Sequence, residues 1–103
     1  MPTYIVLVRF TQKGMENIMD SPKRLEAARK LGKSLGGEIT AAYYTMGQYD
    51  MVVIMEVPSN EAAMEGLLKT GSLGNVKTET LLAIPAEKGI EIFGIALTTQ
   101  QNF

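Results

Sequence analysis

The chain has 103 residues, a formal net charge of −1 at neutral pH, and no Cys, His or Trp. Without Cys and His there is no disulfide, thiolate nucleophile or imidazole base, and no thiolate or imidazole metal ligand, so we expect neither a metal nor a cofactor. The length suffices for one domain with a modest core, and the acidic pI near 5.4 argues against nucleic acid as a partner.

The N-terminus and the composition indicate a cytoplasmic protein without a membrane partner. Residues 1–4 lead directly into an apolar stretch without the basic segment of a signal peptide, and no apolar run is long enough to span a bilayer. The absence of Cys is compatible with a reducing compartment. Several basic residues, Arg24 among them, lie in residues 23–33, where helical spacing distributes them over a solvated face.

The beginning of the chain predicts a strand followed by a helix. Residues 3–10 (TYIVLVRF) are β-branched and aromatic without a breaker, which favours a strand. After a short helical turn over residues 15–19, Pro22 opens a segment with leucines at helical spacing, which Gly36 and Gly37 end. We therefore expect the first long helix between these punctuating residues.

The middle of the chain predicts a β-hairpin. Residues 39–46 (ITAAYYTM) and 49–57 (YDMVVIMEV) both have the composition of strands. Only Gly47 and Gln48 separate them, and the glycine can supply the positive φ that a two-residue hairpin turn requires.

A second helix and a fourth strand follow the hairpin. Ser59 or Asn60 can cap a helix that ends near Gly71. Residues 76–84 (VKTETLLAI) alternate between apolar and polar residues, and Pro85 ends this strand.

This order of elements predicts an α+β fold of the ferredoxin-like βαββαβ type, with a four-stranded antiparallel sheet and both helices on one face. In the first strand Val6 and Val8 share one face while Ile5 and Leu7 share the other, so both faces are apolar. Two helices can cover only one face, and the other would expose more apolar surface than soluble monomers usually do. We therefore expect a homodimer or higher homo-oligomer in which two sheets pack face to face, as in dimeric α/β barrels.

The C-terminal extension, residues 85–103, lies outside this pattern. Ile90, Phe93 and Leu97 repeat at helical spacing, whereas residues 90–92 also alternate as in a strand. The apolar content argues against disorder and predicts that the extension docks on the sheet face or on a partner subunit.

The hairpin sequence MGQYDMVV, residues 46–53, resembles the short motif for which the GYD-domain family is named. The resemblance continues in the same order through residues 10–14 (FTQKG), 35–37 (LGG) and 74–81 (GNVKTETL), and it covers about residues 1–84. It implies one ferredoxin-like domain that forms half of a dimeric α/β barrel. It implies no particular chemistry.

Two candidate ligand-binding residues, Tyr49 and Asp50, follow the hairpin turn. Alternation directs their side chains to opposite faces, so either one can reach a cleft between the sheet and the helices or between subunits. The structural alternative is that the Asp50 carboxylate accepts turn or loop N–H bonds while the Tyr49 ring packs and its hydroxyl finds a backbone partner.

Three further candidates are Arg9, Thr78 and Thr80. Arg9 lies late in the first strand and can form an ion pair with Asp50 or Glu56, or anchor an anionic ligand. Thr78 and Thr80 alternate along the last strand, where their hydroxyls can satisfy local needs or line a ligand cleft.

Three functional hypotheses follow. The favoured one is a small homo-oligomeric ligand-binding or sensor module, with a cleft beside the sheet that takes a small apolar or carboxylate-bearing molecule. The second is a cofactor-independent enzyme, by analogy with the monooxygenases and isomerases among similar barrels, in which Tyr, Asp, Glu or Arg would transfer protons. The third is a purely structural assembly protein. The sequence identifies no catalytic residue.

Overall fold

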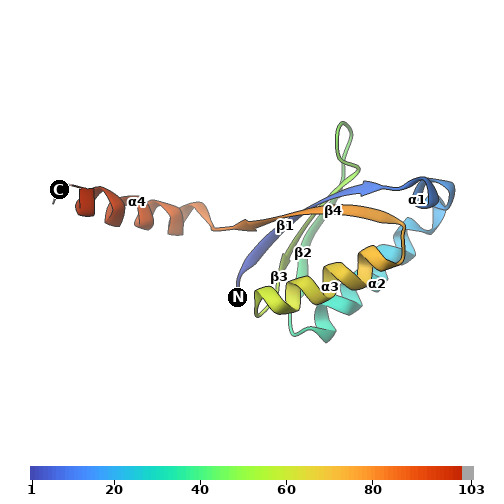
Figure 1. Cartoon of the computed structure of the whole chain (residues 1–103), viewed down its shortest axis with the longest axis horizontal. Helices are drawn as coiled ribbons and strands as arrows, with labels where there is room; N and C mark the ends of the chain where they lie inside the picture. The colour runs from blue at the N-terminus through green and yellow to red at the C-terminus, as the bar shows by residue number, and fades with distance from the viewer. Residues whose placement is uncertain (101–103) are drawn as a thin grey trace.

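The computed structural model describes residues 1–100 and contains one four-stranded antiparallel sheet with the strand order β2-β3-β1-β4 (Figure 1). The strands are β1 (Thr3–Phe10), β2 (Glu38–Tyr44), β3 (Met51–Glu56) and β4 (Val76–Ala83). The central strand β1 pairs with β3 on one side, where Val6 lies opposite Val53, and with β4 on the other, where Val6 lies opposite Thr80. This arrangement confirms the predicted ferredoxin-like fold.

Two of the helices, α2 and α3, pack against one face of this sheet (Figure 1). The helical elements are α1 (Gln12–Glu16), the 3₁₀ turn η1 (Ile18–Asp20), α2 (Ser21–Ser34), α3 (Asn60–Ser72) and α4 (Ala86–Gln100). The Ser59 hydroxyl caps α3 by accepting the backbone N–H of Ala62 at 3.1 Å, and Gly36, with φ +84°, follows α2. Helix α2 lies beside β2 and α3 beside β4.

Alternation along the strands divides the sheet into two faces. On the face toward the helices, Tyr4, Val6 and Val8 of β1 are buried with Met51 of β3. We call the other side the open face. It carries Ile5, Leu7 and Arg9 of β1, Tyr43 of β2, Val52 and Ile54 of β3, and Glu79 and Leu81 of β4. No helix covers this face in the described chain (Figure 1).

The connection between β2 and β3 is longer than the predicted two-residue turn. Residues 45–50 form a loop that stands out from the sheet (Figure 1). The Thr45 backbone N–H donates to the Asp50 carbonyl at 2.9 Å, and the Thr45 hydroxyl donates to the Tyr49 carbonyl at 2.6 Å. These bonds close the loop without continuing the strand pairing. Gly47 has a φ of +111°, as the turn prediction requires.

The C-terminal extension forms helix α4, which projects away from the sheet of its own chain (Figure 1). Its first turn closes with a bond from the Gly89 N–H to the Pro85 carbonyl at 2.9 Å. Of the two patterns left open for this segment, the structure has the helical one, and docking on a partner stays a prediction. The last part of the predicted extension, residues 101–103, lies outside the described residues. Across residues 1–100, no helix is both long and apolar enough to cross a membrane.

Candidate functional site

An apolar cleft of about 520 Å³ lies between the sheet and the pair of helices. Because α2 lies beside β2 and α3 beside β4, the two helices leave space between them over the central strands. The floor includes Val6, Val8 and Met51, and the walls include Leu25 of α2 and Leu67 of α3. The volume falls in the range of small-molecule sites, about 300–1,000 Å³, and the lining is of the usual apolar kind.

One end of the cleft carries a fixed cation. The half-buried Arg24 guanidinium donates to the Asn17 carbonyl at 2.9 Å and to the Gly14 carbonyl at 3.3 Å. Its Cζ lies 6.0 Å from the centroid of the Phe10 ring. These contacts hold the side chain at the cleft, and a guanidinium offers five N–H donors, so donors are left for a carboxylate. The opposite end of the cleft is lined by apolar residues such as Leu35 and Val57.

The candidates Thr78 and Thr80 lie on the same side of the sheet as this cleft. Thr78 lines the cleft itself. Both threonines also line a smaller groove of about 360 Å³ between α3 and β4, together with Met64 and Leu68. The structure therefore brings these two hydroxyls to the helix side of β4.

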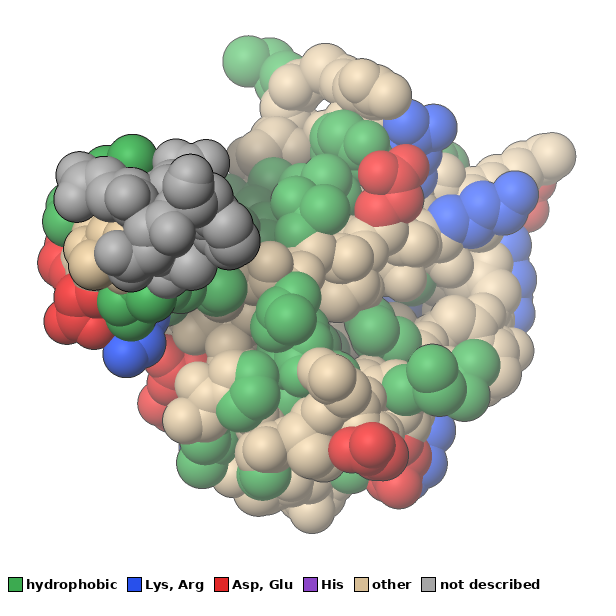
Figure 2. All heavy atoms as spheres, turned by 60° about the vertical axis from the view of Figure 1, so that its left-hand side comes forward, with side chains coloured by type: hydrophobic (Ala, Val, Ile, Leu, Met, Phe, Trp, Pro, Cys, Tyr) green, Lys and Arg blue, Asp and Glu red, His purple; other side chains and the backbone are tan. Residues whose placement is uncertain are grey.

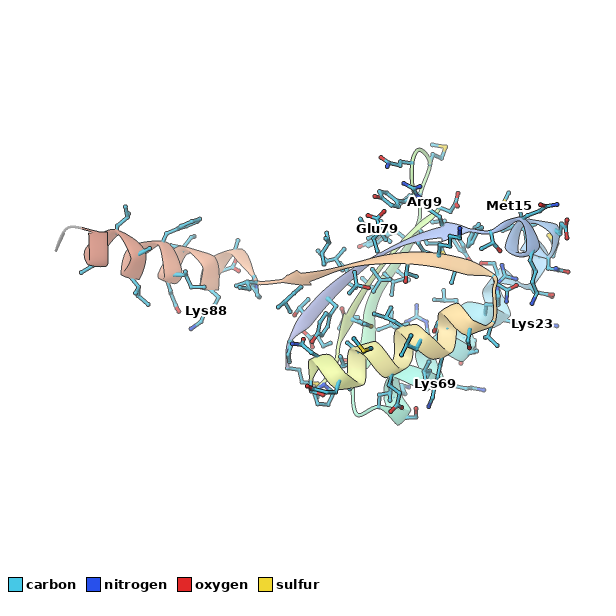
Figure 3. All side chains as sticks on the ribbon, viewed as in Figure 1. Arg9, Met15, Lys23, Lys69, Glu79 and Lys88 are labelled. Carbon is cyan, nitrogen blue, oxygen red and sulfur yellow. The ribbon has the colours of Figure 1, made fainter. Side chains whose placement is uncertain are left out.

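The candidates Arg9 and Tyr49 meet on the open face instead, where Figure 3 shows Arg9 near Glu79. The Tyr49 hydroxyl donates to a carboxylate oxygen of Glu79 at 2.9 Å, and Arg9 Cζ lies 4.9 Å from the Tyr49 ring centroid. The loop before β3 thus reaches across β1 to β4. The predicted ion pairs of Arg9 with Asp50 or Glu56 are not found among the described residues, and a cation–π contact takes their place.

The candidate Asp50 completes the backbone pairing at the end of β1. Its Oδ2 accepts the Phe10 N–H at 2.8 Å, and its own N–H donates to the Val8 carbonyl at 2.8 Å. The carboxylate thus accepts a backbone N–H, as in the structural alternative for Asp50, but from strand β1 rather than from the turn or loop. The Tyr49 hydroxyl likewise has a side chain, Glu79, in place of the expected backbone partner.

The five candidates therefore occupy three places in one chain, and the roles proposed for them in ligand binding stay predictions. Two residues at these places were not predicted from the sequence. Arg24, expected on a solvated helix face, lines the cleft, and Glu79 binds Tyr49. The position of Arg24 could have been anticipated because it lies next to Leu25 on an amphipathic helix. The second requires the cross-strand register, which pairs Glu79 with Leu7.

A protein of known name is similar in sequence to most of this chain. A Thermus thermophilus protein named glutamine synthetase and cystathionine beta-lyase binding protein is 37% identical over 86 residues. The match covers 82% of this chain and 90% of that protein.

Two solved structures share the fold. The crystal structure of TTHA0845 from Thermus thermophilus has a TM-score of 0.53 and 27% identity, covering 82% of this chain and 94% of that one. A feast or famine regulatory protein from M. tuberculosis, complexed with L-methionine, has a TM-score of 0.62 and 19% identity. That match covers 82% of this chain, which spans only 50% of the M. tuberculosis protein. The GYD domain model matches residues 4–93, and with these relatives it shows that the chain belongs to the GYD domain family.

Proposed function

We propose that this protein is a homodimeric ligand-binding module whose cleft between α2, α3 and the sheet takes a small apolar molecule with a carboxylate. The observation that carries the proposal is the apolar cleft of about 520 Å³ with a cation at one end. A tightly packed core would leave no such space, because protein interiors normally contain few voids larger than a water molecule.

The lining defines the class of ligand. Apolar walls favour an aliphatic or thioether chain, and Met51 and Met55 line the cleft with side chains that adapt to different shapes. At the cation end, Arg24 suits a carboxylate, which can accept two parallel bonds from a guanidinium. The M. tuberculosis protein that shares this fold was crystallised with L-methionine, a molecule of this class.

The open face supports the homodimer. Its side chains are mostly apolar, and Leu81 and Tyr43 are 49% and 59% exposed in the single chain. Two copies that pack open face to open face about a two-fold axis would remove this surface from water and form the dimeric α/β barrel. The polar Arg9, Tyr49 and Glu79 of this face contact one another, so their polar groups have partners within the chain.

The ligand proposal is tested by calorimetric titration with octanoate, with 1-octanol as the uncharged match. We expect octanoate to bind, and Ala28→Trp, which fills the cleft, to abolish binding of both probes. Arg24→Gln should weaken the affinity for octanoate by roughly 10- to 100-fold, as expected for a lost charge-assisted hydrogen bond. The affinity for 1-octanol should stay unchanged. Arg29→Gln, on the same helix and outside the cleft lining, is the control. Octanoate binding that survives Ala28→Trp would contradict the assignment.

We also propose a second role, binding to an enzyme of nitrogen or sulfur metabolism. The supporting observation is the 37% identical relative, which is named for binding glutamine synthetase and cystathionine beta-lyase. Size-exclusion chromatography of the full chain with purified glutamine synthetase should give co-elution. Separate elution of this chain from both enzymes at micromolar concentrations would refute this role without affecting the ligand proposal.

A further inference from the structure

Helix α4 exposes a stripe of apolar side chains to solvent. Ile90, Phe93 and Leu97 follow at intervals of three and four residues and are 67%, 69% and 58% exposed. Figure 2, in which α4 comes forward, shows hydrophobic side chains on this helix and in patches on the body. A helix of 15 residues that contains Gly89 and Gly94 has little stability alone in water, so α4 requires a surface to pack on.

The connection to β4 directs α4 away from its own body. Only Ile84 and Pro85 separate Ala83, the last residue of β4, from Ala86, the first of α4. Proline fixes its own φ and keeps the preceding residue extended, so this joint does not reverse the chain. In the structure this joint carries α4 away from the sheet and helices that precede it (Figure 1), so the surface it needs belongs to another molecule.

A second exposed apolar surface lies at the edge of the body from which α4 departs. The groove between α3 and β4, which we call the α3–β4 groove, has a volume of about 360 Å³ and an apolar lining that includes Tyr4. Two of its lining residues, Met64 and Leu68, are 64% and 66% exposed. Leu82 extends the apolar surface along β4 and is 61% exposed.

We propose that α4 of one copy lies in the α3–β4 groove of a second copy, and that the exchange is reciprocal. Each chain carries one such helix and one such groove, so a two-fold pair buries both surfaces. A foreign partner on α4 would leave the groove exposed. An amphipathic helix in an apolar groove is a common mode of recognition, anchored by residues at intervals of three and four.

The geometry and the area support the exchange. Because α4 leaves from the C-terminal end of β4, two copies set antiparallel along their β4 edges bring each helix to the other's groove. Each helix offers three apolar anchors, and each groove offers three with Leu82 included. Two-fold symmetry repeats this contact, so the exchange buries on the order of 1,200 Å² of surface in total, which is the lower bound for stable interfaces. The contact does not use the open face, and it shares only the lining residues Ala63, Leu67 and Thr78 with the cleft, so it joins open-face dimers into a larger assembly.

The absence of Cys from the chain allows a direct test by cross-linking. Full-length Phe93→Cys and Leu68→Cys variants are mixed and oxidised, and the disulfide-linked peptide is quantified by mass spectrometry. We expect this peptide at a yield at least tenfold above that of Phe93→Cys mixed with Lys33→Cys, an exposed position of α2. A disulfide between Phe93→Cys and Tyr43→Cys instead would overturn the proposal, because it would place α4 on the open face of a neighbour.

The assembly mass provides an independent measurement. Phe93→Glu places a charge in the apolar stripe, and light scattering should show the mass of its assembly halved at equal concentration. Glu91→Gln, on the polar side of α4, should leave the mass unchanged. An unchanged mass for Phe93→Glu would refute the exchange, and far-ultraviolet circular dichroism of both variants shows whether the rest of the fold is intact.

Discussion

The Asp50 carboxylate replaces a backbone acceptor at the end of the central strand, and its removal tests the structural role of the hairpin motif. Oδ2 accepts the Phe10 N–H at 2.8 Å, while the Asp50 N–H donates to the Val8 carbonyl at 2.8 Å. Asp50→Ala keeps the second bond and deletes the first. The Phe10 N–H then loses its acceptor in a partly buried environment.

The expected loss of stability follows from this single bond. A hydrogen bond to a charged group contributes about 1.5–3 kcal/mol, and the half-buried position of Asp50 favours the lower end, about 1.5 kcal/mol. At about 4–8 °C per kcal/mol for a domain near this size, Asp50→Ala should lower Tm by roughly 6–12 °C. Asp50→Asn keeps an oxygen acceptor without the charge, so its loss should be about 0.5–1 kcal/mol.

Urea denaturation followed by circular dichroism measures these differences, at one protein concentration because assembly contributes to apparent stability. Glu26→Ala, which removes an exposed carboxylate from α2, is the control and should stay within about 0.5 kcal/mol of the parent chain. The reasoning would be refuted by an Asp50→Ala variant as stable as the parent, or by an Asp50→Asn variant less stable than Asp50→Ala.

Three backbone predictions can be checked by the same denaturation experiment. Gly37→Ala should cost about 3 kcal/mol, because its Cβ would lie 2.0 Å from the Glu56 carbonyl oxygen, and a loss below about 1 kcal/mol would contradict that contact. Gly71→Ala, with no atom within 4 Å of the added Cβ, should stabilise α3 by about 0.5–1 kcal/mol, and any destabilisation would oppose this account. Ser59→Ala removes the cap on Ala62 and should cost about 1 kcal/mol, whereas Ser59→Asp should retain most of it.

The fold could be predicted from the sequence because local signals agreed with one another. The β-branched and aromatic composition of residues 3–10, without a breaker, located the first strand, and Ser59 located the start of α3 within one residue. The hairpin turn was predicted too short because its loop is closed by the Thr45 side chain. Whether a side chain closes the loop or the strands continue to pair does not change the hydrophobic periodicity of the sequence.

The candidate site was less predictable because it depends on how elements are placed relative to one another. Alternation correctly separated Tyr49 from Asp50, but the partner of Tyr49 is Glu79, thirty positions further along and set by the register of β4. The proximity of Arg24 to the cleft depends on the rotation of α2 about its axis. An arginine in solvent and an arginine at the cleft can occupy the same positions of a helical pattern, so the sequence pattern alone did not distinguish the two environments.

The alternation of β1 has a thermodynamic consequence for the proposed module. Val6 and Val8 form the floor of the cleft, while Leu7, one peptide bond from each, lies on the open face. In the proposed dimer, one strand would thus be a wall common to the ligand and to the neighbouring subunit. There, a displacement of the floor by a ligand would reach the interface without any intervening element. Linkage is reciprocal: if a ligand raises the affinity of the two subunits for each other, dimerisation raises the affinity for the ligand by the same factor.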